Sequence, residues 1–311
     1  MEKLPYHVVD VFSDAPLRGN PVMVVLVQAE LDAAQMQAFA AWNGMPETVY
    51  LRRPAEAQDA DAYQVRIFSP RTELAFAGHP SLGAAHVALA CGLVSPPPFT
   101  PTQGAFSTFE GQESTLWQHS PGTSAQIKVL QHPSGNVELF VKTPTPGTVR
   151  PLTAGQASAV CQATGSAVEC LVYRVSAGAN WVVFKLGSAA DLASLSPDMP
   201  TIEVLSAELG VSGVTVYAPT SAGERGQFEV RSFGPAIGVP EDAVCGGGNA
   251  CVAALEHELS YAQSSGTPYL TQQGRFVGRE GYVHLIGPVE DQRFWLGGTA
   301  TTVMTGAVNF A

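Results

Sequence analysis

Two short turns rich in glycine stand directly before segments with a helical pattern. One is Gly78-His79 and the other is Gly246-Gly247-Gly248. The first amides of a helix have no partner inside it, and the helix dipole makes that end positive, so each turn can hold an anion. Neither turn contains Lys or Arg, and neither matches the P-loop or the GxGxxG pattern of phosphate-binding turns. A substrate carboxylate therefore suits them better than a phosphate. The alternative is that both are tight helix starts without a ligand.

Glu47 begins a strand-like run and can act as an acid or a base. A half-buried carboxyl has a raised pKa, so it can take and return a proton near neutral pH. Asp242 and Glu241 precede the second glycine turn, where one of them could orient His79 or hold a substrate amine. From spacing alone, each acid could instead be a solvated residue at a strand edge or in a loop.

His79 and Cys245 both stand at helix starts. The helix dipole there lowers the pKa of each side chain, which favours a neutral imidazole and a reactive thiolate. His79 could donate to an anionic intermediate or relay a proton, or it could be structural. Cys245 could abstract a proton next to a carboxylate, whereas we expect Cys251, six residues further on, to lie in the core.

The segments that must position these residues alternate between strand-like and helical patterns. Runs of β-branched and aromatic residues predict strands over Val8–Phe12, Val22–Val27, Thr48–Leu51 and Tyr63–Phe68. A helix is predicted over Leu31–Asn43, where Asp32 can cap its start. A second helix over Ser81–Ala90 is rich in Ala and nearly uncharged, so we expect it to be buried on all sides.

The second half of the chain repeats this order. Four short matches recur at offsets of 160 to 168 residues: Asn20 with Asn180, Thr48–Tyr50 with Thr215–Tyr217, Val65–Pro70 with Val230–Pro235, and Ala77–Pro80 with Cys245–Gly248. Matches in the same order at a nearly constant offset indicate an internal duplication. Two similar halves about a pseudo-twofold axis would leave a cleft where the two glycine turns face each other, and ligands often bind in such clefts.

The duplication also predicts where the two halves differ. The counterpart of Glu47 is Val214, so the acid/base group belongs to one half only. The counterpart of Cys245 is Ala77, which has no proton to give, so a racemase with two opposed thiols is disfavoured. We expect an α+β fold of two pseudo-symmetric halves, with the boundary in the weakly patterned stretch 111–126. The N-terminal half is residues 1–115, completed by a returning strand at 297–311, and the C-terminal half is residues 116–296.

The composition bounds the class of protein. The chain has 311 residues, of which 45% are hydrophobic and 14% charged, and its net charge is −11. These values suit two packed domains and disfavour nucleic acid or an anionic membrane as a partner. Five cysteines without a CxxC pair argue against a disulfide scaffold and a metal site, and they favour the cytoplasm. The sequence shows no apolar signal segment and no apolar run of membrane-spanning length.

These motifs together resemble the phenazine-biosynthesis-like (PhzF-like) isomerase family, which has the diaminopimelate epimerase fold. The matching segments run along nearly the whole chain: Gly19-Asn20-Pro21, Gln35-Met36-Gln37, Glu47-Thr48, Arg66–Pro70, Glu73-Leu74, Phe76–Pro80 with Leu82-Gly83, Gly238–Asp242, Gly274-Arg275 and Gly278-Arg279. The resemblance implies two halves, each a β-barrel-like sheet wrapped around a central helix, with the active site between them. It also implies an isomerase without a cofactor that acts on a small carboxylate and is usually a homodimer.

In the family's characterised isomerase, which acts on trans-2,3-dihydro-3-hydroxyanthranilate, the matching glutamate shuttles a proton between two carbons. By resemblance this role falls to Glu47, with His79 and Asp242 assisting. Substrate binding would fall, also by resemblance, to Asn20, Gly78, Gly246 and Gly247.

The sequence departs from the family pattern at the site itself. Pro46 stands where the family usually has Ser, and in the motif that usually reads EDPATGSA, Cys245 replaces Thr and Gly247 replaces Ser. We therefore expect a different substrate and a thiol that shares the proton transfer with Glu47. Two alternatives stay open: an amino-acid racemase, epimerase or dehydratase that uses Cys245, and a binder of small acids without catalysis.

Overall fold

The computed structural model describes residues 2–29, 31–53, 60–168, 170–260, 268–289 and 291–310. The chain divides into two compact units, which we call unit 1 (Met1–Pro144 with Gly297–Ala311) and unit 2 (Thr145–Leu296). The division falls after residue 144 and not after residue 115. The reason is that the polar stretch 111–126, expected to contain the boundary, forms two paired strands of unit 1.

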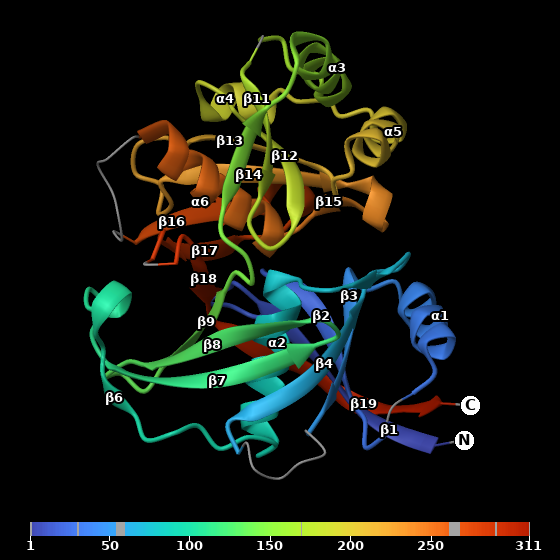
Figure 1. Ribbon diagram of the computed structural model, residues 1–311, viewed down its shortest axis with the longest axis vertical. Helices are drawn as coiled ribbons and strands as arrows, with labels where there is room; N and C mark the ends of the chain where they lie inside the picture. Colours follow the sequence, from blue (N-terminus) through green and yellow to red (C-terminus); the bar gives the residue numbers. More distant parts are fainter. Residues whose placement is uncertain are drawn as a thin grey trace. The chain divides into compact units, whose positions relative to one another are not determined.

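Unit 1 holds most of its strands in the first half of the chain (Figure 1). Its elements are β1 Glu2–Val11, β2 Asn20–Leu26, α1 Ala33–Asn43, β3 Glu47–Arg52, β4 Ala62–Phe68, β5 Glu73–Leu74, α2 Gly78–Ala90, β6 Thr100–Pro101, a 3-10 turn at Gly104–Phe106, β7 Gln112–Ser120, β8 Thr123–Gln131, β9 Val137–Lys142 and β19 Ala300–Phe310. Strand β19 pairs antiparallel with β1 along its whole length. The last residues of the chain thus complete a sheet that the first residues begin.

Helix α2 forms the centre of unit 1 (Figure 1). Ten of its 13 residues are buried, and it packs against β1, β2, β3, β4, β9 and β19. Because the helix carries no charged residue, strands can cover it on every side, so its predicted burial is confirmed. At Gly83 a Cβ atom would lie 2.4 Å from a methyl group of Val22, so only glycine allows helix and strand to approach this closely.

Helix α1 lies on the outer side of the same strands. The Asp32 carboxylate accepts a hydrogen bond from the Gln35 amide (3.1 Å), which is the predicted N-cap. Met36 and Ala40 are buried against Tyr50 and Phe68. Alternate residues of β2 and β3 therefore face α1 on one side and α2 on the other.

Unit 2 repeats this plan (Figure 1). Its elements are β10 Thr148–Pro151, α3 Ala154–Thr164, β11 Val172–Ser176, β12 Asn180–Lys185, α4 Ala189–Ala193, α5 Met199–Leu209, β13 Val214–Pro219, β14 Phe228–Gly234, a 3-10 turn at Pro235–Ile237, β15 Val239–Asp242, α6 Gly246–Ser260, β16 Tyr269–Gln273, a 3-10 turn at Arg275–Val277 and β17 Gly281–Ile286. Strand β18, Trp295–Gly298, spans the division between the units. The central helix α6 packs against β10 to β13 and β17, and α3, α4 and α5 cover the outer face of the strands.

Strand pairing shows that the two units are related by duplication. In unit 1, β2 pairs parallel with β3, so that Val22 is opposite Glu47. In unit 2, β12 pairs parallel with β13, so that Val182 is opposite Val214. The register therefore makes Val214 the counterpart of Glu47, as the sequence predicts. The predicted α+β fold of two similar halves, each with strands around a central helix, is confirmed.

Candidate active site

Glu47 is buried at the first position of β3. Its side chain is 6% exposed, so the alternative of a solvated glutamate at a strand edge is wrong. The parallel pairing of β3 with β2 brings it to the same end of the sheet as Asn20, the first residue of β2. The start of α2 lies at this end as well, since the Nε2 atom of His79 is 3.2 Å from Oε2 of Glu47.

His79 connects Glu47 with Asn20. It is the second residue of α2 and is buried, and its Nδ1 atom lies 3.3 Å from the Nδ2 atom of Asn20. Burial lowers the pKa of His79 to about 3, although a hydrogen bond with the backbone of Pro21 opposes the change. The imidazole is therefore neutral at neutral pH, and its contact with Glu47 is a carboxyl–imidazole contact and not an ion pair. The structure thus groups three residues predicted for the site: Glu47, His79 and Asn20.

The neutral ring also binds the backbone of Pro21, which has no N–H, so the ring is the donor there. The contact of 3.2 Å between Nε2 of His79 and Oε2 of Glu47 is close but lacks the geometry of a hydrogen bond. A neutral imidazole carries one donor and one acceptor nitrogen, and its partners decide which nitrogen holds the proton.

The starts of the two central helices are organised alike. Both helices begin earlier than expected, α2 at Gly78 and α6 at Gly246, so the glycines form the first helical turn and do not precede it. Proline suits the first turn, because the amide N–H that it lacks has no internal partner there in any case. Pro80 removes the third amide in α2, and in α6 the Gly248 amide donates to Sγ of Cys245 (3.2 Å). The first two amides of each helix point out of the helix.

Cys245 is the N-cap of α6. Its sulfur accepts a hydrogen bond from the third amide of the helix, as the hydroxyl of Ser or Thr does at this position. The side chain is buried, and its counterpart Ala77 caps α2 without any side-chain bond. A structural role for the sulfur is therefore an alternative to the catalytic role expected from the sequence. Cys251 is fully buried, as expected for a core residue, and burial raises the pKa of its thiol to about 12.

The two acids before the turn have different surroundings. Glu241 forms a bidentate ion pair with Arg231 (2.9 and 2.9 Å), so it is held away from any role at the turn. A matching pair in unit 1 joins Glu73 to Arg66 (2.8 and 2.7 Å). Asp242, the last residue of β15, is buried and lies three residues before Cys245. Of the two acids, Asp242 remains the candidate.

Two residues at this turn have no predictive sequence signal of their own. Trp181, next to Asn180, packs on Gly247, where a Cβ atom would be 3.1 Å from the indole Nε1. The corresponding positions of unit 1 hold Pro21 and His79. The bulky side chain therefore lies on the helix in unit 1 and on the strand in unit 2. Gln273 binds the backbone on both sides of the turn. Only the match at Gly274-Arg275, directly after it, draws attention to this segment.

Within the described residues, no group of three or more His, Cys, Asp or Glu side chains is placed to hold a metal ion. No helix in the same part of the chain is long and apolar enough to cross a membrane.

Comparison with known proteins identifies the family. The family model described as phenazine biosynthesis-like protein matches residues 9–306. An uncharacterized isomerase of Deinococcus radiodurans is 31% identical over 93% of this chain and 88% of its own length. The trans-2,3-dihydro-3-hydroxyanthranilate isomerase of Pseudomonas aeruginosa is 30% identical over 83% of this chain and 82% of its own.

Solved structures agree on the fold. The crystal structure of the Bacillus anthracis phenazine biosynthesis protein of the PhzF family superposes with a TM-score of 0.79. The alignment covers 99% of this chain and 100% of the other, at 18% identity. The chain therefore belongs to the phenazine biosynthesis-like protein family, and its relatives mark it as an isomerase.

Proposed function

We propose that this isomerase moves a proton, and with it a double bond, in a small carboxylic or amino acid, with Glu47 as the acid/base group. The observation that carries the proposal is the contact of 3.2 Å between the buried Glu47 carboxyl and a neutral His79. A buried carboxyl beside a group that can either donate or accept is suited to taking and returning one proton.

The step balances without a co-reactant. The ionised Glu47 removes a proton from a carbon of the substrate, so that a C–H bond breaks and its electron pair enters the adjoining conjugated system. The protonated carboxyl, whose proton can exchange with solvent before it is passed on, then gives a proton to the far end of the system, where a new C–H bond forms. The double bond has shifted, and substrate and product have the same composition.

The helix starts supply the sites for negative charge. The outward-pointing amides of Gly78, Gly246 and Gly247 are suited to a carboxylate, because they combine free N–H groups with the positive end of a helix dipole. Such donors also stabilise the negative charge that develops when the proton leaves carbon. The buried carboxyl of Asp242, at the end of β15, is suited to a polar group of a small acid, for example an amine.

The substrate differs from that of the Pseudomonas aeruginosa relative, which is named for trans-2,3-dihydro-3-hydroxyanthranilate. The reasons are Pro46 before the proposed base, and Gly247 covered by the Trp181 indole where the family usually has Ser. We further propose that the enzyme is a cytoplasmic homodimer and needs no cofactor.

Proton NMR in heavy water tests the proposal. The enzyme is incubated with a panel of unsaturated cyclic and acyclic amino and carboxylic acids, including trans-2,3-dihydro-3-hydroxyanthranilate. We expect one class of acid to lose a C–H signal and form an isomer, and Glu47→Gln to abolish this while the protein stays folded. Full turnover by Glu47→Gln would refute the assignment, and binding of an acid without any exchange would indicate a protein without catalysis.

The Cys245 sulfur supports a second candidate, a racemase, epimerase or dehydratase. An N–H bond at a helix start also stabilises a thiolate, which could remove an α-proton. A serine at position 245 can still cap the helix, but its hydroxyl is a much weaker base than a thiolate. If Cys245 is the base, Cys245→Ser loses exchange of the α-proton and a thiol alkylator inactivates the enzyme unless substrate protects it. An unchanged rate in Cys245→Ser would leave the sulfur with its capping role alone.

A further inference from the structure

Gln273, the last residue of β16, joins both sides of the turn that carries Asp242 and Cys245. Its Oε1 accepts a hydrogen bond from the backbone N–H of Cys245 (3.1 Å), and its Nε2 donates to the backbone carbonyl of Asp242 (2.9 Å). The residue is 3% exposed, so water cannot replace these bonds without a local opening of the structure. One amide therefore sets the separation of two residues, of which the proposed function places Asp242, and the second candidate function Cys245, at the substrate.

Asn249 closes the network around the same turn. Its Nδ2 donates to Oε1 of Gln273 (2.8 Å) and to the carbonyl of Cys245 (2.9 Å). Its Oδ1 accepts from the hydroxyl of Thr271 (2.6 Å), and both Asn249 and Thr271 are fully buried. Turn, helix start and strand end are thus linked by neutral hydrogen bonds, an arrangement that selects one conformation.

The duplication shows which part of this network is special to unit 2. The bond between Thr271 and Asn249 has a counterpart in unit 1, where Gln118 donates to the hydroxyl of Ser81 (2.8 Å). These positions correspond, because Tyr63 is opposite Gln118 and Phe228 is opposite Thr271 in the parallel strand pairs.

Gln273 itself has no such counterpart. It is opposite Val230, and the matching position in unit 1, beside Val65, is Ser120, whose side chain is too short to bridge a turn. Among the described residues, the bridging amide therefore belongs to the half that carries Asp242 and Cys245, although both halves share the scaffold.

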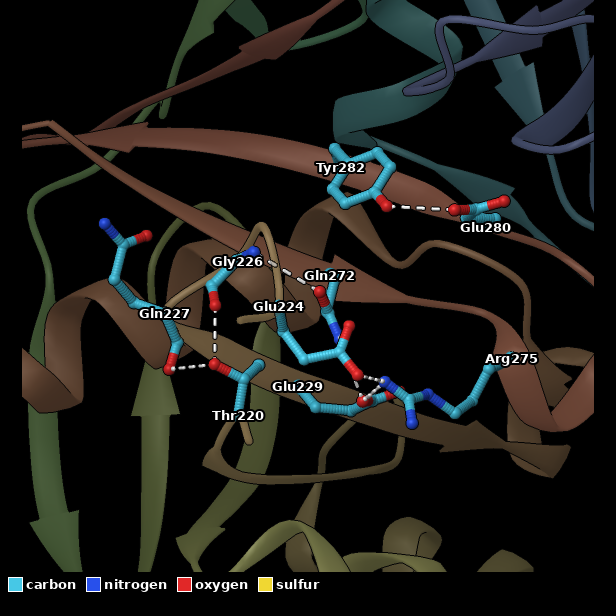
Figure 2. Close-up of polar contacts among 9 residues, drawn as sticks. All are labelled: Thr220, Glu224, Gly226, Gln227, Glu229, Gln272, Arg275, Glu280 and Tyr282. Atoms are coloured by element: carbon cyan, nitrogen blue, oxygen red, sulfur yellow. Dashed lines mark hydrogen bonds and ion pairs between the residues drawn. The ribbon is translucent and has the colours of Figure 1, made fainter. Parts of the chain in front are cut away.

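The far side of the same strand end is anchored independently (Figure 2). Gln272 points away from the turn, where its Oε1 accepts from the Gly226 amide (3.2 Å) and its Nε2 donates to Glu229 (3.1 Å). Arg275 forms ion pairs with Glu229 (2.5 Å) and Glu224 (3.3 Å). These contacts fix the end of β16 from outside, so Gln273 acts from a rigid support. They also make Gln272 a matched control, being a buried glutamine next in sequence with its bonds on the other face.

We propose that Gln273 is a positioning residue, which holds Asp242 and Cys245 in the arrangement needed for the reaction without touching the substrate. The inference rests on the proposed function for the roles of those two residues. It also makes a structural claim that needs no substrate: the turn keeps its conformation through the Gln273 amide.

Hydrogen exchange tests the structural claim. Gln273→Met keeps the volume of the side chain and removes all its hydrogen bonds, and Gln272→Met does the same on the other face. We expect the amides of residues 243–249 to exchange about tenfold faster in Gln273→Met, since a buried bond has been lost there. Gln272→Met should leave that peptide at the wild-type rate. Equal exchange in Gln273→Met and wild type would overturn the proposal.

Kinetics with the acid that isomerises test the positioning role. We expect Gln273→Met to lower kcat by about tenfold to hundredfold with a smaller change in KM, as for a displaced reacting group. Gln273→Glu keeps an acceptor for the Cys245 amide, but it sets a second acceptor against the Asp242 carbonyl unless its carboxyl is protonated. Its kcat relative to wild type should therefore rise as the pH falls, which general destabilisation would not produce. A pH-independent ratio, or kcat equal to that of Gln272→Met, would contradict the proposal.

The two claims can fail separately. If Glu47→Gln keeps full activity while Gln273→Met loses both protection and kcat, the proposed function is wrong and the positioning role stands. If Glu47→Gln is inactive and Gln273→Met matches wild type in both assays, the positioning role is wrong.

Discussion

The buried His79 should make the protein sensitive to acid. Its pKa is lowered from 6.5 to about 3, first because burial disfavours the charged ring. Between these two values the unfolded chain binds a proton at this position and the folded chain does not. The free energy of unfolding therefore falls as the pH drops below 6.5, and the contribution of His79 is constant above that value.

The size of the effect follows from the two pKa values. At pH 5 the unfolded state gains about 2 kcal/mol from protonation of this one residue, relative to pH 8. This is an upper value, because an ionised Glu47 at 3.2 Å would favour the charged ring and offset part of it. Such a difference is a sizeable part of the stability of an ordinary domain.

Urea unfolding followed by fluorescence at pH 8, 7, 6 and 5 measures how the free energy of unfolding depends on pH. The comparison is between wild type and His79→Gln, whose amide can still form hydrogen bonds but does not titrate. We expect the difference in unfolding free energy between the two to change by up to about 2 kcal/mol from pH 8 to pH 5, in favour of the variant at low pH. His119→Gln, in the same unit, controls for the loss of a partly exposed imidazole. Parallel pH profiles for wild type and His79→Gln would refute the reasoning.

Substitutions at three further positions test the architecture of unit 2. Gly248→Ala would bring a Cβ to 2.5 Å from the hydroxyl of Thr215, so we expect a loss of about 1–3 kcal/mol in urea unfolding, and no loss would show that the helix start has room. Arg231→Met would leave the carboxylate of Glu241, whose side chain is only 14% exposed, without its bidentate partner, at a cost of about 3 kcal/mol, and the melting temperature should fall accordingly. Cys245→Ala removes the cap of α6 and should cost about 1 kcal/mol, whereas Cys245→Ser should cost less; equal losses would show that the sulfur does not cap the helix.

Much of the fold could be predicted from residue patterns. The Asp32 cap, the uncharged α2 and the buried strands all follow from local preferences that tertiary packing does not override. The pairing of Glu47 with Val214 across the duplication also followed from sequence, because it needs only two segments in a constant order. What these features share is that short segments determine them.

The boundary between the units could not be read in this way. Strands β7 and β8 carry Gln, Ser, Thr and His on their exposed faces, so their composition is that of a linker. Their pairing with each other and with β4, β6 and β9 shows that they are strands. Helices α2 and α6 begin before their predicted starts for a related reason: glycine and proline are poor inside helices but are tolerated in the first turn.

The role of Gln273 could not be predicted from the sequence at all. It lies 28 residues from Cys245 in the chain, and its bonds to the turn depend on the path of β16 past the start of α6. Neither its type nor its neighbours predict which of the adjacent glutamines faces the turn. The burial of Glu47 was undecided from sequence for the same reason, since it comes from the helix that packs above β3 and not from the strand itself.

The central claim is that the Glu47 carboxyl moves the proton. The most direct measurement is the rate of deuterium uptake into carbon, from heavy water, for the acid that the enzyme isomerises. Two matched variants are compared with wild type: Glu47→Gln, and Glu113→Gln, which neutralises an equally buried carboxyl that pairs with Lys128 in the same unit. We predict that Glu47→Gln lowers the rate by at least about 1000-fold while Glu113→Gln keeps it within a few-fold of wild type. Uptake at the wild-type rate in folded Glu47→Gln would contradict the account.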